Sequence, residues 1–343
     1  MRKLEALLRE NIRSLKPYSS ARDEFTGSEG TFLDANENPF GILNRYPDPY
    51  QKKLKERLSI LKGVKQENIF IGNGSDEVID LAFRIFCEPG KDKVLTFSPT
   101  YGMYEVSASI NNVEVLKLPL NETFQINRKS LEPYFKDETI KIIFICSPNN
   151  PTGNVMKAAD ITYILDQFDR IVIIDEAYID FAGEEASSLS LIEQYERLII
   201  SQTLSKAWGL AGARIGIAYA SNPILKLFNK VKPPYNISQL NQTAALQVLS
   251  DTTLFDRRVN FILNEKKRIK EALLQLSLVK KIYPSDANFL LVEVEDADLT
   301  YHQLVGQKVI VRNRNNYVKN CIRISIGDQE ENNRLLEALK SLS

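Results

Sequence analysis

One lysine, Lys206, lies between two hydroxyl residues and an arginine. Thr203 and Ser205 precede it, and Arg214 follows it by eight positions. A lysine at the end of a strand can form a Schiff base with an aldehyde cofactor, and a nearby cation helps to keep its amine neutral. The hydroxyls and the guanidinium could hold a phosphate on that cofactor. A Ser-Lys pair alone is common and usually exposed, so this interpretation depends on other residues.

Polar residues upstream could bind the ring of such a cofactor. Asp175 ends an apolar run, where a buried carboxylate needs a partner, and a protonated ring nitrogen would provide one. Asn150 and Tyr178 could bind a ring oxygen, and Tyr101 could stack on the ring. Each residue also has an ordinary interpretation, because Asp175 could cap a turn, Asn150 could belong to one, and Tyr101 could pack in the core. Together with Lys206 they indicate pyridoxal phosphate, and so an enzyme of amino-group chemistry.

A glycine-rich turn over 72–75 leads from an apolar run into a helical pattern. Its Gly74 and Ser75 could bring backbone N–H groups to a phosphate at the start of that helix. An N-cap followed by acidic residues explains the same sequence without a ligand. The specific signal is therefore the order along the chain: a phosphate turn, a tyrosine, an asparagine turn, Asp-x-x-Tyr, and a lysine with an arginine eight residues later.

Short β-branched runs alternate with helical patterns through the middle of the chain. Several are apolar on both faces, as in a mostly parallel sheet that lies between helices. The runs span 69–71, 93–97, 141–146, 171–174, 198–201 and 215–219. They predict an α/β fold with ligands at the carboxyl ends of the strands, where the polar residues described above lie. The 31 residues between Asp175 and Lys206 allow one helical crossover between neighbouring strands.

The pattern changes at Pro233 and Pro234, because proline can continue neither a helix nor a central strand. A smaller α+β domain is expected after them. Its elements would be a charged helix over about 253–276, strands over 288–292, 308–311 and 321–326, and a closing helix from Asp328 with Glu331 in a capping box. We predict an N-terminal helix and arm over 1–35 that packs with the small domain, a large cofactor-binding domain over 36–235, and a small domain over 236–343.

Composition argues against several classes of function. The 343 residues carry a formal net charge of zero, so no binding to nucleic acid or to an anionic membrane is expected. His302 is the only histidine, which argues against multi-histidine metal sites and a Ser-His-Asp mechanism. Three cysteines lie far apart, charges occur within the first five residues, and no apolar run reaches membrane-spanning length. A cytoplasmic protein without a metal is expected.

In these residues and their order, the chain resembles the fold-type I pyridoxal-phosphate-dependent aminotransferases, and within them the histidinol-phosphate aminotransferases. The resemblance covers nearly the whole chain and includes the segments 15–22, 33–39, 44–48, 232–236 and 321–327. One departure is Trp208, where phenylalanine is usual after Lys-Ala. The resemblance implies transamination between L-histidinol phosphate and 2-oxoglutarate, which gives imidazole acetol phosphate and L-glutamate in histidine biosynthesis.

The resemblance also assigns roles to residues around the cofactor. Lys206 would bind the aldehyde, Asp175 would pair with the ring nitrogen, and Tyr101 would stack on the ring. Asn150 and Tyr178 would contact the ring oxygen. The residues that would hold the cofactor phosphate are Gly74, Ser75, Thr203, Ser205 and Arg214.

Further residues would bind substrate or come from a second subunit. By the same resemblance, Arg323 would bind the carboxylate of glutamate, while Arg312 and Tyr18 would contact the substrate phosphate. Asn150 would also face the substrate. Tyr46 would reach the cofactor phosphate of the other subunit, which implies a homodimer with shared sites.

Other classes fit part of the pattern. An aromatic or broad-range aminotransferase, or an enzyme like threonine-phosphate decarboxylase, would share this fold and cofactor and differ in its substrate pocket. A regulatory protein that binds the cofactor as a signal would need a DNA-binding extension and a basic patch. We do not expect that class, because the N-terminal arm is short and the formal net charge is zero.

Overall fold

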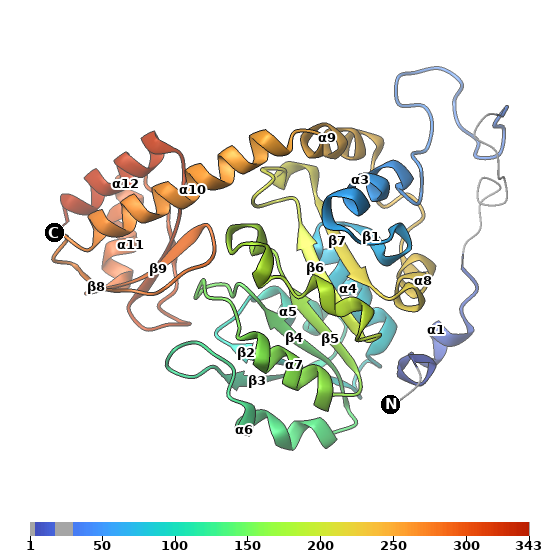
Figure 1. Cartoon of the computed structure of the whole chain (residues 1–343), viewed down its shortest axis with the longest axis horizontal. Helices are drawn as coiled ribbons and strands as arrows, with labels where there is room; N and C mark the ends of the chain where they lie inside the picture. The colour runs from blue at the N-terminus through green and yellow to red at the C-terminus, as the bar shows by residue number, and fades with distance from the viewer. Residues whose placement is uncertain (1–3, 18–29, 343) are drawn as a thin grey trace.

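The computed structural model describes residues 4–17 and 30–342, which contain two sheets (Figure 1). The larger sheet has seven strands in the order β1-β7-β6-β5-β4-β2-β3. Its strands are β1 (Ile69–Asn73), β2 (Lys93–Ser98), β3 (Glu114–Pro119), β4 (Ile140–Cys146), β5 (Ile171–Asp175), β6 (Leu198–Thr203) and β7 (Ile215–Ala220). Strand β7 is antiparallel to β1 and β6, and the other neighbouring pairs are parallel. The predicted α/β class with a mostly parallel sheet is confirmed.

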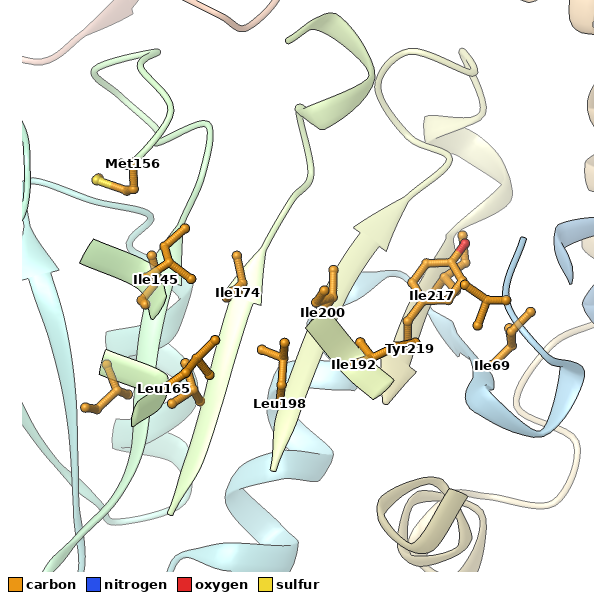
Figure 2. Close-up of a cluster of buried hydrophobic side chains, with 14 of the residues drawn as sticks. Ile69, Ile145, Met156, Leu165, Ile174, Ile192, Leu198, Ile200, Ile217 and Tyr219 are labelled. Atoms are coloured by element: carbon orange, nitrogen blue, oxygen red, sulfur yellow. The ribbon is translucent and has the colours of Figure 1, made fainter. Parts of the chain in front are cut away.

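Both faces of this sheet are buried, which explains why its strands read as continuous apolar runs. Ile145, Ile174 and Ile200 point from three neighbouring strands into one core cluster (Figure 2). The residues just before the first two, Phe144 and Ile173, belong to a second cluster on the opposite face. Alternate side chains of a strand thus fill two separate cores.

Helices cover each face. The first cluster includes residues of α3 (Lys52–Lys62), α6 (Arg128–Leu131), α7 (Ala158–Gln167) and α9 (Gln239–Leu249). The second includes residues of α4 (Ser75–Phe86), α5 (Met103–Ile110) and α8 (Asn222–Val231). The sheet therefore lies between two layers of helices. Because both of its faces are covered, polar side chains are expected at the carboxyl ends of its strands.

The N-terminal segment differs from the prediction. It forms a short 3-10 helix η1 (Leu4–Leu7) and the helix α1 (Glu10–Ser14), and its buried Leu7 and Ile12 join the cluster beneath α4 and α8. The backbone N–H of Arg9 donates to the carbonyl of Ile85 at 3.1 Å, and the ammonium of Lys230 donates to the carbonyl of Ile12 at 2.7 Å. These described residues pack on the large sheet's helices, where apolar surface is available, and not on the small domain.

The smaller sheet is antiparallel, with the order β10-β11-β9-β8. Its strands are β8 (Val279–Ile282), β9 (Phe289–Val294), β10 (Arg312–Asn313) and β11 (Cys321–Ser325), and its helices are α10 (Thr252–Leu273), α11 (Ala297–Gly306) and α12 (Gln329–Lys340). The capping box of Asp328 and Glu331 is present. The 22-residue helix α10 runs from α9 to the small sheet (Figure 1).

Two predicted elements were wrong. The segment 308–311 is not a strand, because Lys308 turns the chain with φ of 62° and only Arg312 and Asn313 pair with β11. The connection from β5 to β6 holds no α-helix. It is made of the 3-10 helices η4 (Ile179–Phe181), η5 (Glu184–Ala186) and η6 (Leu189–Glu193). The division into domains at residue 235 stays a prediction.

In the ranges 4–17 and 30–342, every helix is too short or too polar to cross a membrane.

Candidate active site

The polar residues that follow the strands line one cavity at the carboxyl edge of the large sheet. Ser75 begins α4 after β1, Asp175 ends β5, and Thr203 ends β6. The remaining lining residues that the sequence predicted are Tyr101, Asn150, Tyr178, Ser205, Lys206 and Arg214. The carboxyl ends of these strands lie at one edge of the sheet, so residues at or after the ends of five strands, β1, β2, β4, β5 and β6, meet at this cavity.

Lys206 faces this cavity beside Tyr178. Its ammonium nitrogen lies 5.5 Å from the centre of the Tyr178 ring. Burial lowers the pKa of Lys206, and the positive charges of Arg323 and Arg214 lower it further. The negative charge of Asp175 acts in the opposite direction. The lysine therefore has a larger neutral fraction than a free lysine, as a nucleophile or a proton acceptor requires.

Asp175 is buried at the base of the cavity. Its Oδ2 accepts a 2.7 Å hydrogen bond from the hydroxyl of Tyr104, and its Oδ1 accepts a 3.1 Å bond from the backbone N–H of Ala177. Burial raises the pKa of Asp175, while these two hydrogen bonds act to lower it. No lysine or arginine of the described ranges forms an ion pair with it. A protonated ring nitrogen is a chemically suitable partner for such a carboxylate.

The turn before α4 fits closely against the start of β7. Gly74 has a φ of 76°, and its N–H donates to the carbonyl of Arg214 at 2.9 Å. A Cβ on Gly74 would lie 2.6 Å from a terminal nitrogen of Arg214, and a Cβ on Gly216 would overlap the backbone of Gly74 and Ser75. Only glycine at both positions allows this close approach, which places the N-terminus of α4 beside the start of β7, and a helix N-terminus favours phosphate.

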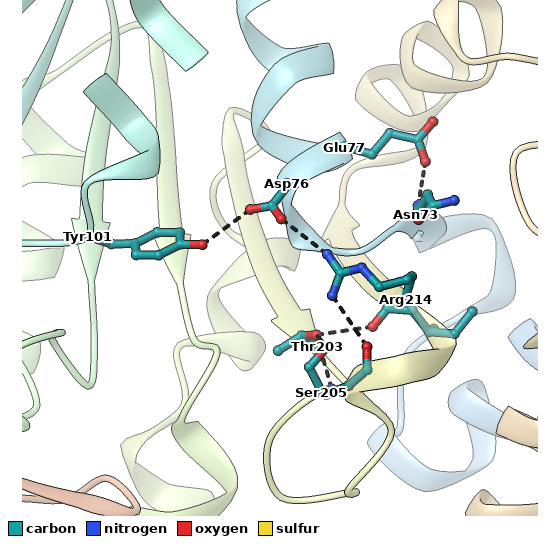
Figure 3. Close-up of polar contacts among 9 residues, drawn as sticks. Asn73, Asp76, Glu77, Tyr101, Thr203, Ser205 and Arg214 are labelled. Atoms are coloured by element: carbon teal, nitrogen blue, oxygen red, sulfur yellow. Dashed lines mark hydrogen bonds and ion pairs between the residues drawn. The ribbon is translucent and has the colours of Figure 1, made fainter. Parts of the chain in front are cut away.

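Hydroxyl groups and a guanidinium complete this cradle (Figure 3). The N–H of Ser205 donates to Thr203 Oγ1 at 3.2 Å, and the Thr203 hydroxyl donates to the carbonyl of Ile215 at 3.1 Å. Arg214 lies 3.2 Å from Asp76 Oδ2. These groups converge beside Gly74, and so a phosphate here would meet hydroxyl, amide and guanidinium donors.

Asp76 lines the cavity and is one of the acidic residues at the start of α4, for which we predicted no role in a site from the sequence. Its Oδ1 accepts a 3.3 Å bond from the hydroxyl of Tyr101, while its other oxygen pairs with Arg214 (Figure 3). It thus links the expected ring-stacking tyrosine to the phosphate cradle. An acidic first-turn residue is so common in helices that its sequence position gave no signal of this contact.

Three arginines on or just after strands of the small sheet form a cluster that reaches the cavity through Arg323. Arg323 on β11 donates to Asn150 Oδ1 at 2.5 Å, and Arg312 on β10 is its cross-strand partner. Arg314 is half-buried, and burial together with Arg323 and Arg312 lowers its pKa to about 10. Within the described residues none of the three pairs with a carboxylate, and the Nε atoms of Arg314 and Arg323 are buried without a hydrogen-bond partner. Such a cluster of cations favours anionic ligands.

Arg314 was not predicted from the sequence. Its position two residues after Arg312 could have indicated it, because residues two apart in an extended chain lie on the same side. Tyr104 was also missed, because its bond to Asp175 depends on a contact between distant segments.

The predicted residues Tyr18 and Tyr46 are not among those that line the cavity in the described part of the chain. Tyr18 is outside the described residues. Tyr46 does not line the cavity of its own chain; its ring stacks on Tyr235 with 4.4 Å between centroids. Asn150 and Tyr178 are in contact, with 3.4 Å between the amide nitrogen and the hydroxyl oxygen.

A larger cavity of about 960 Å³ lies between α3, η4–η6 and α10. Its lining contains the 3.0 Å ion pair of Lys62 and Asp180, and Trp208 forms part of its wall. It holds none of the predicted site residues, so the smaller cavity around Lys206 is the better candidate for chemistry.

The chain is similar to known aminotransferases over nearly its whole length. The family model for aminotransferase class I and II matches residues 29–339. A histidinol-phosphate aminotransferase of Parabacteroides distasonis is 51% identical over 100% of this chain and 99% of its own length. One from Cytophaga hutchinsonii is 49% identical over 98% of this chain and 99% of its own. The crystal structure of the histidinol-phosphate aminotransferase from Clostridium acetobutylicum has a TM-score of 0.81, with 26% identity, and covers 90% of this chain and 97% of that one.

Proposed function

Since the chain belongs to the aminotransferase class I and II family, and within it to the histidinol-phosphate aminotransferases, we propose that it transfers an amino group between L-histidinol phosphate and 2-oxoglutarate. The products are imidazole acetol phosphate and L-glutamate, in histidine biosynthesis. The observation that carries the proposal is the placement of Lys206, a buried Asp175 and a phosphate cradle around one cavity, beside three arginines without carboxylate partners in the described ranges.

The cavity suits pyridoxal phosphate. When bound, this cofactor supplies an aldehyde that condenses with amines and a ring that withdraws electrons from the neighbouring carbon. Asp175 would hold a proton on the ring nitrogen, and Tyr101 would stack on the ring. Asn150 and Tyr178 would donate to the ring oxygen. The phosphate would be held by Gly74, Ser75, Thr203, Ser205 and Arg214.

Lys206 has the properties of the group that moves the proton. In its neutral form, Nζ can accept the proton from the substrate carbon that bears the amine, and it would pass that proton to the former aldehyde carbon of the cofactor. The lowered pKa supports this role, because a larger fraction of the amine is then free to accept a proton. The ring of Tyr178 lies beside the ammonium nitrogen and limits where it can reach.

The arginines explain how one site accepts two different anions. Arginine binds carboxylate and phosphate through paired N–H groups. Arg323 would bind the carboxylate of glutamate, while Arg312 and Tyr18 would bind the phosphate of histidinol phosphate. Arg314 would add a third positive charge next to that phosphate, since it lies beside both other arginines and burial has removed part of its hydration.

A homodimer in the cytoplasm is part of this proposal. The segment before α3 exposes apolar side chains that a monomer would leave in water: Leu33 is 88% exposed, Phe40 82% and Ile42 97%. A second copy of the chain would cover them. Tyr46 lies close to this segment in the sequence and is half-exposed, and in the proposed dimer it would contact the phosphate cradle of the partner.

An absorbance titration of the cofactor-loaded protein tests the proposal. L-Histidinol phosphate, added without a keto acid, should convert the bound cofactor to its amine form, and 2-oxoglutarate should reverse the change. If aromatic amino acids cause the conversion and histidinol phosphate does not, the enzyme is an aromatic aminotransferase. Release of carbon dioxide without the amine form would identify a decarboxylase instead.

A further inference from the structure

Tyr104 is a buried tyrosine whose hydroxyl reaches the base of the cavity. It is the second residue of α5 and is 1% exposed. Its hydroxyl donates to Asp175 Oδ2 at 2.7 Å, and the Ala177 N–H binds the other carboxylate oxygen. The carboxylate is therefore held from both oxygens, by one side chain and one backbone group.

The ring of Tyr104 is fixed on two sides. It stacks on Phe144 of β4, with 4.8 Å between centroids and 16° between planes. Its edge meets Tyr101 at 5.6 Å and 87°. Phe144 is fully buried and packs in turn on Phe83 of α4. The hydroxyl thus has little freedom to turn away from Asp175, and Tyr101 rests against the same ring.

A buried carboxylate that accepts few hydrogen bonds tends to take up a proton. Burial raises the pKa of Asp175, and the Tyr104 hydrogen bond is the largest influence that lowers it. Tyr104 itself stays protonated, because burial and then Asp175 raise its pKa well above the ordinary value. The hydroxyl is therefore a donor throughout the working pH range.

We propose that Tyr104 is a positioning residue that keeps Asp175 ionised and oriented toward the ring nitrogen of the cofactor, and that supports the stacking ring of Tyr101. The inference rests on the proposed function, because it requires pyridoxal phosphate in the cavity. Tyr104 would thus belong to the site without touching the cofactor, because it acts through Asp175 and Tyr101.

The test measures the affinity of the protein for pyridoxal phosphate after the cofactor has been removed. In Tyr104→Phe, Asp175 loses a hydrogen bond to a charged group, so the Kd should rise about tenfold to a hundredfold. Tyr219→Phe is the matched control, since Tyr219 is also fully buried in the large sheet and its hydroxyl has no partner among the described residues. Its Kd should stay within twofold of the wild-type value.

The pH dependence of binding separates positioning from a loss of packing. In Tyr104→Phe the carboxyl group should protonate at a higher pH, so the acid-side loss of affinity should begin at a higher pH than in the wild type. The groups that face Asp175 and also influence its titration come from α4, the segment before α5, β4 and the loops after β5 and β6: Asp76, Tyr101, Cys146, Tyr178 and Lys206. All of them remain in the variant.

A double variant shows whether Tyr104 acts through the carboxylate. In an Asp175→Asn background, Tyr104→Phe should change the Kd by less than threefold. An unchanged Kd and pH profile in the single variant, or an equal effect in both backgrounds, would overturn the inference. The thermal unfolding of the cofactor-free variants identifies any general loss of folding. If the wild-type protein binds no pyridoxal phosphate, the proposed function fails, and this result is distinct from a failure of Tyr104.

Discussion

The guanidinium of Arg323 donates to Asn150 Oδ1 at 2.5 Å and so joins β11 of the small sheet to the turn after β4 of the large one. The Nε of Arg323 is buried and makes no hydrogen bond within the described residues. The small domain thus contributes a cation with unused donors to a cavity built mainly by the large sheet. Guanidinium groups are chemically suited to carboxylates, which they bind through paired N–H groups.

We expect Arg323→Lys to raise the KM for glutamate by about tenfold or more, since lysine cannot form the paired N–H bonds that arginine makes to a carboxylate. Steady-state kinetics with glutamate as the varied substrate measure this effect. Arg334→Lys, an exposed position on α12, is the control for a loss of one arginine. An unchanged KM in Arg323→Lys would remove this residue from the substrate site.

The reactivity of Lys206 should depend on Arg323. Because the positive charge of Arg323 lowers the pKa of Lys206, Arg323→Gln should raise it. Only the neutral amine reacts with an acylating reagent, so the rise of the Lys206 reaction rate with pH should move to higher pH in the variant. Mass spectrometry of the cofactor-free protein follows this rate, with the exposed Lys267 as an internal reference. Coincident profiles would show that the two charges are not coupled.

Gly216→Ala should weaken both the fold and the cofactor site. The added Cβ would overlap the backbone of Gly74 and Ser75, and overpacking of this kind costs about 1–3 kcal/mol. The same shift would displace the phosphate cradle, so we expect a lower Tm together with a higher Kd for pyridoxal phosphate. At Gly212 an added Cβ has no neighbour within 4 Å, and Gly212→Ala should leave both quantities near wild type. A normal Tm and Kd in Gly216→Ala would contradict the close approach.

Mixed dimers test whether sites are shared. Lys206→Ala should retain cofactor but lose turnover, and Tyr46→Ala should lose most of it. When the two variants are co-expressed, a hybrid dimer would combine the intact Lys206 of one chain with the intact Tyr46 of the other. If the two variants associate at random, half of the dimers are hybrids, and one of the two sites in each hybrid is intact. About a quarter of the wild-type activity should therefore return. If none returns while hybrids are shown to form, Tyr46 does not act across an interface.

Much of the large domain was predictable because its strands are buried on both faces and end in polar residues. The missed strands β3 and β8 lack this signal. Strand β8 contains Lys280 and Lys281, which are exposed, and β3 lies at the edge of its sheet with Glu114 and Pro119 exposed. In contrast, the apolar segment 308–311 looked like a strand, but the chain turns before it can pair.

Site residues were predictable when they belonged to a local pattern and were missed when only the fold brings them together. Lys206 and Arg214 stand in one segment, and the lysine could be interpreted from its neighbours. Tyr104 meets Asp175 across 71 residues of chain, and Arg323 meets Asn150 across 173. No local pattern in the sequence predicts the contact between Tyr104 and Asp175, and the contribution of Arg323 was expected only from a family resemblance.

The reversed direction of β7 determines which changes in chain length the protein can tolerate. Thr203 pairs with Gly216, so the chain leaves the sheet after β6 and returns to the same edge within one hairpin. Lys206 and Arg214 are both carried by that hairpin, and their separation is set by its contour length. A residue inserted there would shift Lys206, which would bind the cofactor covalently, relative to Arg214, which would hold the cofactor phosphate. Insertions in the longer connections between parallel strands would leave this pair in place, so length variation should be concentrated there.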